Sequence, residues 1–388
     1  MPGFEVFGEE ELAAIVDLFK QNGGIVFAHG FDAMRKGIYK VREYERAFAD
    51  NIGIKHAQAV SSGSAALKVA LDALGIGRGD EVITQAFTFV ATVEAICETG
   101  ATPIIVDIDD TLGMSAAAFE AAITPRTKAV IPVHMMGEPA EMDSILAVAR
   151  RHNILVLEDA AQAVGASYKG KKTGTIGDIG AFSTDAGKTL NTGEGGMVVT
   201  DSDELFVRAR GAHDHGHEYS KTLGRGEEGA IGPGFNYRMT ELQGAIGLVQ
   251  LSKIDHIVER QRANKAALME RIKGLPVKFR RSPDANGDIG DTIVMYLPDR
   301  ARAAAFVAAM REEKLGTKNL PDAVRWHFAK HWSHLFKGHP LYDGNNYSWQ
   351  SSADILECSV ALPVMVKMDP DRIEFLGEKL VGIGRKIL

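Results

Sequence analysis

Residues 180–196, GAFSTDAGKTLNTGEGG, place a single lysine, Lys188, among small and hydroxylated residues. An apolar run ends at Ser183 and a second begins at 197–200, so the pattern predicts a β-strand on each side of the lysine. A lysine held there is expected to lie in a dry, crowded pocket. Desolvation would lower its pKa and free the amine as a nucleophile toward a carbonyl and as a proton carrier. Most lysines lie in solvated loops, and such a loop would account for the same residues. The rest of the sequence therefore has to distinguish a reactive lysine from an ordinary surface lysine.

Short apolar strands alternate with helices through the rest of the first half of the chain. Strands of this kind, buried on both faces, predict an α/β fold with a mainly parallel sheet covered by helices. Ligands of such sheets bind beyond the carboxyl ends of the strands. The expected strands are 56–60, 81–84, 103–107, 129–133 and 154–159, and the expected helices include 9–21, 65–74, 87–96, 142–152 and 203–210.

Two strand ends carry polar residues suited to a ligand. Ser61 to Ser64 separate a strand from a helix, and the free amides and positive dipole end of a helix N-terminus suit a phosphate. Ser64 could equally cap the helix, and the two roles are compatible. Asp159 follows another strand, with Gln162 one turn later; this carboxylate either caps a helix or holds a positive charge in the cleft.

The pattern changes after residue 276 to a smaller α+β unit. It has an expected strand at 292–296 and expected helices at 300–313 and 370–387, and one long helix is expected from 235 to about 272. We therefore predict a large domain with an N-terminal arm at 1–250 and a small α+β domain at 251–388.

Composition and charge narrow the class of protein. The 388 residues are 45% apolar and 24% charged, as in an ordinary soluble enzyme, and the formal charge of -7 argues against nucleic acid as the main partner. Cys97 and Cys358 are the only cysteines, which excludes a disulfide framework. No secretory pattern and no run of about 18 apolar residues is present, so a cytoplasmic protein is expected.

Histidine clusters can bind a metal ion, and the chain has two of them. The spacing or surroundings of each argue against a metal site. The segment 213–217, HDHGH, spaces its histidines so that they face alternate sides of an extended loop. His327 and His331 are one helical turn apart but lack a matching acidic motif. No metal site is expected, and the second cluster is interpreted as a packed aromatic segment.

With these segments in order, the chain resembles the DegT/DnrJ/EryC1/StrS family of sugar aminotransferases. These enzymes use pyridoxal phosphate and have the aspartate aminotransferase fold, fold type I. The resemblance covers nearly the whole chain, and five motifs in the family's order make it specific. The motifs are 61–67, 87–92, 158–165, 192–196 after Lys188, and 234–239.

The resemblance assigns two residues to the chemistry. Lys188 would bond the cofactor aldehyde and, once released, move the proton during transamination. Asp159 would pair with the pyridinium nitrogen and keep it protonated. Some relatives that carry histidine in place of the lysine are dehydratases. Because this chain retains Lys188, it is expected to transfer an amino group, with glutamate as the donor.

The resemblance also implies the remaining cofactor contacts. Gln162 would contact the ring hydroxyl and Phe89 would stack on the ring. The phosphate would be held by backbone groups at Ser64 and Ala65 and by the Ser183 hydroxyl. Asn236 would reach the phosphate of a neighbouring subunit, so a homodimer with shared active sites is expected.

The sugar acceptor is inferred from departures from the family pattern. The basic stretch after Phe31, residues 214–217 and residues 326–332 are similar to the aminotransferases that make 8-amino-3,8-dideoxy-manno-octulosonate, a lipopolysaccharide sugar. The acceptor would then be the 8-oxo acid, because guanidinium and imidazolium groups bind carboxylates well. An ordinary solvated surface would explain the charged residues of these segments equally well. The residues assigned to the substrate are Arg35, His215, Tyr237 and His327.

Three other functions remain as alternatives. One is an aminotransferase for a nucleotide-linked keto-sugar, and another is a sugar dehydratase on the same scaffold. The third is a pyridoxal-phosphate-binding regulatory module, which would need an attached DNA-binding segment. None is visible before Gly24, and the acidic charge also disfavours it.

Overall fold

A seven-stranded sheet forms the centre of the computed structural model, which describes residues 2–337, 342 and 348–388. In this described part the strand order is β1-β9-β8-β5-β4-β2-β3, and β9 alone is antiparallel to its neighbours. The mainly parallel sheet confirms the predicted fold class. The strands are β1 (His56–Val60), β2 (Glu81–Gln85), β3 (Thr102–Val106), β4 (Thr127–Ile131), β5 (Leu155–Asp159), β8 (Ile179–Ser183) and β9 (Gly196–Thr200).

Helices cover both faces of this sheet because successive side chains of a strand point to opposite faces. Leu157 packs in one apolar cluster with α4 (Gly63–Ala73), and its neighbour Val156 packs in another with α7 (Met142–His152). The remaining helices of this part are α3 (Lys40–Ile52), α5 (Ala91–Glu98), α6 (Ala116–Ala121), α8 (Asp203–Ala212) and the short η1 (Met135–Gly137), and a small ladder joins β6 (Ser167–Tyr168) to β7 (Lys171–Lys172).

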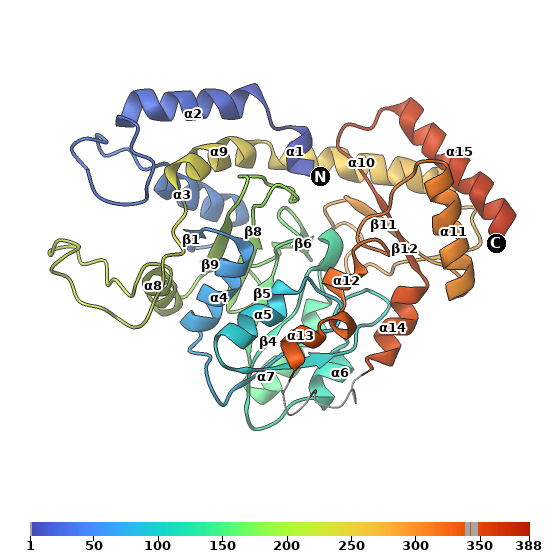
Figure 1. Cartoon of the computed structure of the whole chain (residues 1–388), viewed down its shortest axis with the longest axis horizontal. Coiled ribbons are helices and arrows are strands. Elements are labelled where there is room, and N and C mark those ends of the chain that lie inside the picture. Colours follow the sequence, from blue (N-terminus) through green and yellow to red (C-terminus); the bar gives the residue numbers. More distant parts are fainter. Residues whose placement is uncertain (1, 338–341, 343–347) are drawn as a thin grey trace.

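A second, antiparallel sheet lies beside the first (Figure 1). It consists of β10 (Lys278–Phe279), β11 (Thr292–Tyr296) and β12 (Ser359–Pro363). Its core is shared with α10 (Ile254–Ile272), α11 (Arg300–Glu312) and α15 (Pro370–Ile387). The other helices are α1 (Pro2–Glu5), α2 (Glu9–Asn22), α12 (Val324–His327), η2 (Ala329–His331), α13 (Ser333–Phe336) and α14 (Gln350–Glu357).

The single helix predicted from 235 to about 272 is wrong, because the structure has two. α9 (Glu241–Ser252) begins later than predicted, since residues 236–238 pair with other backbone; the Ser61 amide, for example, donates to the Tyr237 carbonyl at 2.7 Å. α10 then continues from Ile254. The two helices run one after the other from the seven-stranded sheet to the three-stranded sheet (Figure 1). The predicted domain boundary at 250 falls near the end of α9.

Two segments from distant parts of the sequence pack beside the loop that carries Lys188. The amide of Gly3, in α1, donates to the Lys188 carbonyl at 3.1 Å. The Thr88 amide donates to the His327 carbonyl at 2.9 Å, which ties α12 to the turn after β2. The first contact brings the N-terminal helix α1, and the second brings α12 from the second half of the chain, to the carboxyl ends of the parallel strands.

The helices found in the described residues include none that combines the length and the apolar character needed to cross a membrane.

Gly180 in β8 tests how tightly the strand before the lysine loop is packed. A Cβ at this position would lie 2.2 Å from the Gly174 carbonyl oxygen, a backbone atom that cannot move aside easily. We expect Gly180→Ala to destabilise the protein by about 1–3 kcal/mol, as overpacked cores do, measured by thermal and denaturant unfolding. Gly226→Ala is the matched control, because no atom lies within 4 Å of its built Cβ. Equal stability of the two variants would contradict the close packing.

Candidate active site

A cavity of about 810 Å³ lies where the carboxyl ends of β1, β5 and β8 face the three-stranded sheet. Its far wall comes from residues 317–319, 363–365 and Asp291. The structure thus brings together residues that lie far apart in the sequence. Those predicted for the cofactor or substrate that line it are Ser64, Phe89, Asp159, Gln162, Ser183, Lys188 and His327.

The loop that carries Lys188 is held by its own backbone. The Thr184 amide donates to the Gly195 carbonyl and the Ala186 amide to the Gly193 carbonyl, both at 2.9 Å, so the two arms of the loop stay paired. The Lys188 side chain is 20% exposed, and its Nζ lies 3.7 Å from an Asp185 carboxylate oxygen. The Lys188 side chain is thus mostly buried where it meets the cavity.

Asp159 is a buried carboxylate at the end of β5, only 4% exposed. The Thr92 hydroxyl donates to Oδ2 at 2.8 Å and the Ala161 amide donates to Oδ1 at 3.1 Å. Burial raises the pKa of Asp159, and these two hydrogen bonds oppose the shift. A buried carboxylate held mainly by neutral donors is costly to keep charged, so this position suits a cationic ligand group. Thr92 ends the motif 87–92, but no contact with Asp159 was expected of it.

A buried pair supports the strand that ends at Asp159. His134 Nδ1 accepts the Ala140 amide at 3.0 Å, so Nε2 carries the ring proton and donates to Glu158 at 2.8 Å. Glu158 also accepts the amides of Ile176 and Gly177, both at 2.6 Å. The pair fixes β5 against the segment that enters β8, and therefore the spacing of Asp159 and Ser183.

The start of α4 meets the end of β8 closely. A Cβ on Gly63 would lie 2.6 Å from the Ser183 Cβ, so only glycine allows this approach. Ser62 caps the helix by accepting the Ala65 amide at 3.0 Å. The amides of Gly63 and Ser64 precede the intrahelical ladder and suit an anion beside the Ser183 hydroxyl. Ala65 differs from expectation, because it does not line the cavity and its amide is already used by the cap.

Two rings lie side by side in the cavity wall. Phe89 is 42% exposed, and its ring centroid lies 5.4 Å from that of His327. His327 is buried, and its Nδ1 lies 2.9 Å from the Ala323 carbonyl oxygen, so Nδ1 donates and Nε2 remains an acceptor. Burial lowers the pKa of His327, which keeps the ring neutral at neutral pH.

Gln162 accepts the Met136 amide through Oε1 at 3.1 Å.

The structure does not bring Arg35, His215, Tyr237 or Asn236 into this cavity. Arg35 is 0% exposed; it donates to the Phe27 carbonyl at 2.9 Å and lies 3.5 Å from Glu241. A role for Arg35 as a substrate ligand therefore finds no support, since the guanidinium is fully buried and does not line the cavity.

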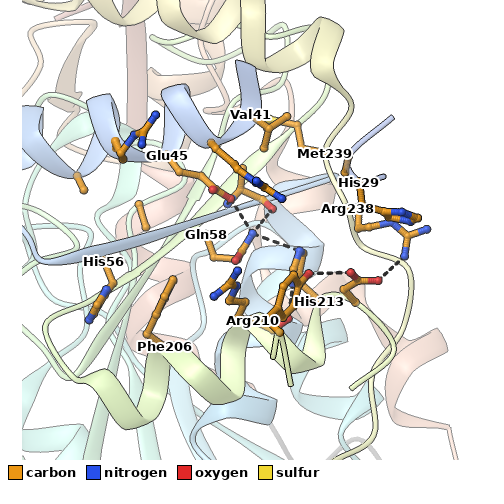
Figure 2. Close-up of a pocket in the computed structure, with 18 of the residues that line it drawn as sticks. His29, Val41, Glu45, His56, Gln58, Phe206, Arg210, His213, Arg238 and Met239 are labelled. Carbon is orange, nitrogen blue, oxygen red and sulfur yellow. Dashed lines mark hydrogen bonds and ion pairs between the residues drawn. The ribbon is translucent and has the colours of Figure 1, made fainter. Parts of the chain in front are cut away.

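A second cavity, of about 410 Å³, lies beside the edge strand β1, between α3 and α8 (Figure 2). Gln58 Nε2 donates to Glu45 at 2.7 Å and lies 3.2 Å from His213 Nε2. Burial raises the pKa of Glu45 to about 7 and lowers that of His213 to about 4. None of the residues predicted for cofactor or substrate lines this second cavity.

The histidine segment 213–217 is used for internal contacts. Asp214 pairs with Arg225 and Arg238, both at 2.5 Å, and His217 lies 2.7 Å from Glu228. Within the described ranges, no group of three or more histidine, cysteine or carboxylate side chains is placed to hold a metal ion.

The chain is similar to known proteins over most of its length. The model of the DegT/DnrJ/EryC1/StrS aminotransferase family matches residues 32–381. GDP-perosamine synthase of Caulobacter vibrioides is 49% identical over 222 residues. These residues span 57% of this chain and 58% of that protein, which is less than two thirds of its length. The spore coat polysaccharide biosynthesis protein SpsC of Bacillus subtilis is 48% identical over 286 residues, 71% of this chain and 70% of that protein.

The fold is also found in solved structures. An aminotransferase from Psychrobacter cryohalolentis matches with a TM-score of 0.85 at 28% identity and covers 98% of both chains. The matched family region contains every motif on which the resemblance was based. The family match and the solved structures together confirm the predicted fold type I aminotransferase and pyridoxal phosphate as the family's cofactor. The chain therefore belongs to the DegT/DnrJ/EryC1/StrS aminotransferase family.

Proposed function

We propose that this chain is a pyridoxal-phosphate-dependent aminotransferase that transfers an amino group from glutamate to an oxo-sugar. The observation that carries the proposal is the meeting, in one cavity, of the Lys188 amine, the buried Asp159 carboxylate and the N-terminus of α4. An amine, a buried anion and an anion site are the three partners that an aldehyde, a protonated ring nitrogen and a phosphate require.

The residues present fit the cofactor part by part. Asp159 lacks a cationic partner at hydrogen-bond distance among the described residues, and the ring nitrogen would supply one. The amides at the start of α4 and the Ser183 hydroxyl would hold the phosphate. Phe89 would lie against the ring and Gln162 near its hydroxyl. When bound, the cofactor supplies an electron sink for the carbanion that forms at the donor Cα.

The chain's own residues then supply the proton transfers. The Lys188 amine would take the proton from the donor Cα and return it to the cofactor. Asp159 would remain ionised and hold the ring nitrogen protonated throughout. His327, neutral and with Nε2 free to accept, would receive a hydrogen bond from a sugar hydroxyl. The retained Lys188 favours this reaction over the dehydratase alternative.

Two acceptor classes are candidates. The resemblance of the stretch after Phe31, residues 214–217 and residues 326–332 implies an 8-oxo-3-deoxy-manno-octulosonate acceptor, and the product would then be an amino sugar of a lipopolysaccharide. A nucleotide-linked keto-sugar is the second candidate, favoured by the similarity to a GDP-perosamine synthase. A screen of both acceptor classes with glutamate as donor distinguishes them by which one yields 2-oxoglutarate at a rate above background.

A homodimer with shared active sites is part of the proposal. Asn236 is exposed and does not line the cavity of its own chain, although its neighbour Tyr237 binds the strand end that leads to α4. The loops around residues 27–34 and 223–235 project on the same side of the molecule (Figure 1). Both expose large apolar side chains, and Phe235 is 67% exposed. An exposed apolar surface of this kind favours an interface with a second copy.

Lys188→Ala tests the central assignment. We expect the variant to fold, to lose the visible absorbance of the lysine-bound cofactor, and to lose turnover by at least ~10³-fold, because no other amine replaces the nucleophile and proton carrier. Lys221→Ala, at an exposed lysine, serves as the control. Turnover near the parent rate in Lys188→Ala would refute the assignment.

Asp159→Asn should separate function from stability. Burial raises the pKa of Asp159, so the folded cofactor-free protein binds this proton more tightly than the unfolded chain does, and its stability falls as the pH rises past the unfolded pKa. The variant should therefore be more stable than the parent at neutral pH without cofactor, and the difference should shrink at acid pH. Turnover should fall by ~10²–10³-fold. Unchanged turnover together with lower stability would contradict this role.

Mixed dimers test whether Asn236 serves the partner's site. A dimer of Asn236→Ala and Lys188→Ala chains contains one intact site if the asparagine acts across the interface, and none if it acts within its own chain. Refolding or co-expressing the two nearly inactive variants should then restore roughly a quarter of the parent activity in a random mixture. Activity that stays at the level of the single variants would exclude a shared site.

A further inference from the structure

The charged side chains of the Lys188 cavity are not balanced. Among the described residues that line it, ammonium groups come from Lys188 and Lys318. Four carboxylates also line it, those of Asp159, Asp185, Glu194 and Asp291. An amino donor with two carboxylates would enter a cavity with a surplus of negative charge, so its binding requires a fixed cation that is not otherwise engaged in the chemistry.

Lys318 is held in place at both ends. Its amide donates to the Ala361 carbonyl of β12 at 2.9 Å, which fixes the backbone against the three-stranded sheet. Its ammonium group donates to Asp291 Oδ2, while the Thr292 hydroxyl donates to the other oxygen of Asp291 at 2.8 Å. The ammonium group is thus positioned by a carboxylate whose own orientation is fixed.

The ammonium group of Lys318 still has donors to offer. The Lys318 side chain is 26% exposed, whereas that of Asp291 is 8% exposed. An ammonium group has three N–H donors, and the contact with Asp291 uses one of them. The remaining donors can bind a carboxylate in the cavity while the pair with Asp291 stays intact.

We propose that Lys318 binds a carboxylate of the amino donor, and that Asp291 is the residue that positions it. This inference rests on the proposed aminotransferase function. Lys188 must bond the cofactor and carry the proton, so it is not available as a permanent charge partner. Burial lowers the pKa of His327, so its neutral ring provides no charge either. Lys318 and Lys188 line the same cavity but come from segments far apart in the sequence, so a donor bound by Lys318 would lie in the cavity that Lys188 also reaches.

Lys318→Met removes the charge and keeps the length of the side chain. The holoenzyme is mixed with glutamate alone, and the conversion of the cofactor's visible absorbance gives the donor's apparent Kd and the rate at saturation. Glutarate, a dicarboxylate without an amino group, is titrated by calorimetry as a probe of binding without reaction. We expect ~10–100-fold weaker binding of both in the variant, the loss typical of a charge-assisted contact, with a smaller change in the saturated rate.

Two further variants control for damage to the fold. Lys318→Arg keeps the charge and should retain most of the affinity for glutarate. Lys314→Met removes an exposed lysine of the preceding turn that does not line the cavity, and should behave as the parent does. Thermal unfolding of all variants shows whether weaker binding in Lys318→Met reflects the site or a loss of structure.

Each outcome separates this inference from the proposed function. A parent enzyme that shows no spectral response to glutamate refutes the function itself. A parent that responds, together with a Lys318→Met variant that binds glutamate and glutarate as tightly, refutes the role of Lys318 alone. Unchanged binding of glutamate with a raised KM for the oxo-sugar would also overturn the inference, because the carboxylate bound by Lys318 would then belong to the acceptor.

Discussion

The site depends on the convergence of parallel strands at one edge of the sheet. Because β1, β5 and β8 run in the same direction, their carboxyl ends deliver the start of α4, Asp159 and the Lys188 loop to one place. The close contact of Gly63 with Ser183 fixes two of these ends against each other. The His134–Glu158 pair fixes β5 against the segment before β8. The chemistry of the cavity therefore depends on packing that lies behind it.

The burial of Asp159 lowers the stability of the cofactor-free chain and favours the binding of a positive charge. A carboxylate with two neutral donors and little contact with water is unfavourable in the cofactor-free chain, as its raised pKa shows. The same burial strengthens its attraction to a positive charge, because water does not screen the contact. Lys318 is paired with Asp291 in the same cavity, and the contact leaves further ammonium donors for a ligand. In the proposed roles, Asp159 would hold the resident cofactor and Lys318 the exchanging donor.

Much of the fold could be predicted from local pattern. The strand at 56–60, the helix at 142–152 and the strand at 292–296 match the structure at both ends, because each has apolar residues at the spacing of its element and clear breaks beside it. The helix expected from 235 failed for a tertiary reason. Residues 236–238 bond to the end of β1 instead, a contact that periodicity does not reveal.

The sequence by itself determined the family, the order of the elements and the identity of the residues around Lys188, since motifs and apolar periods are local properties. Only the tertiary structure decided which charges share the cavity. Arg35 is a basic residue in a polar stretch, yet it is buried beside Glu241 and does not line the cavity. Lys318 carries no local signal, and it reaches the cavity because β12 and Asp291 hold it there. Side-chain position depends on long-range packing, which a one-dimensional pattern does not encode.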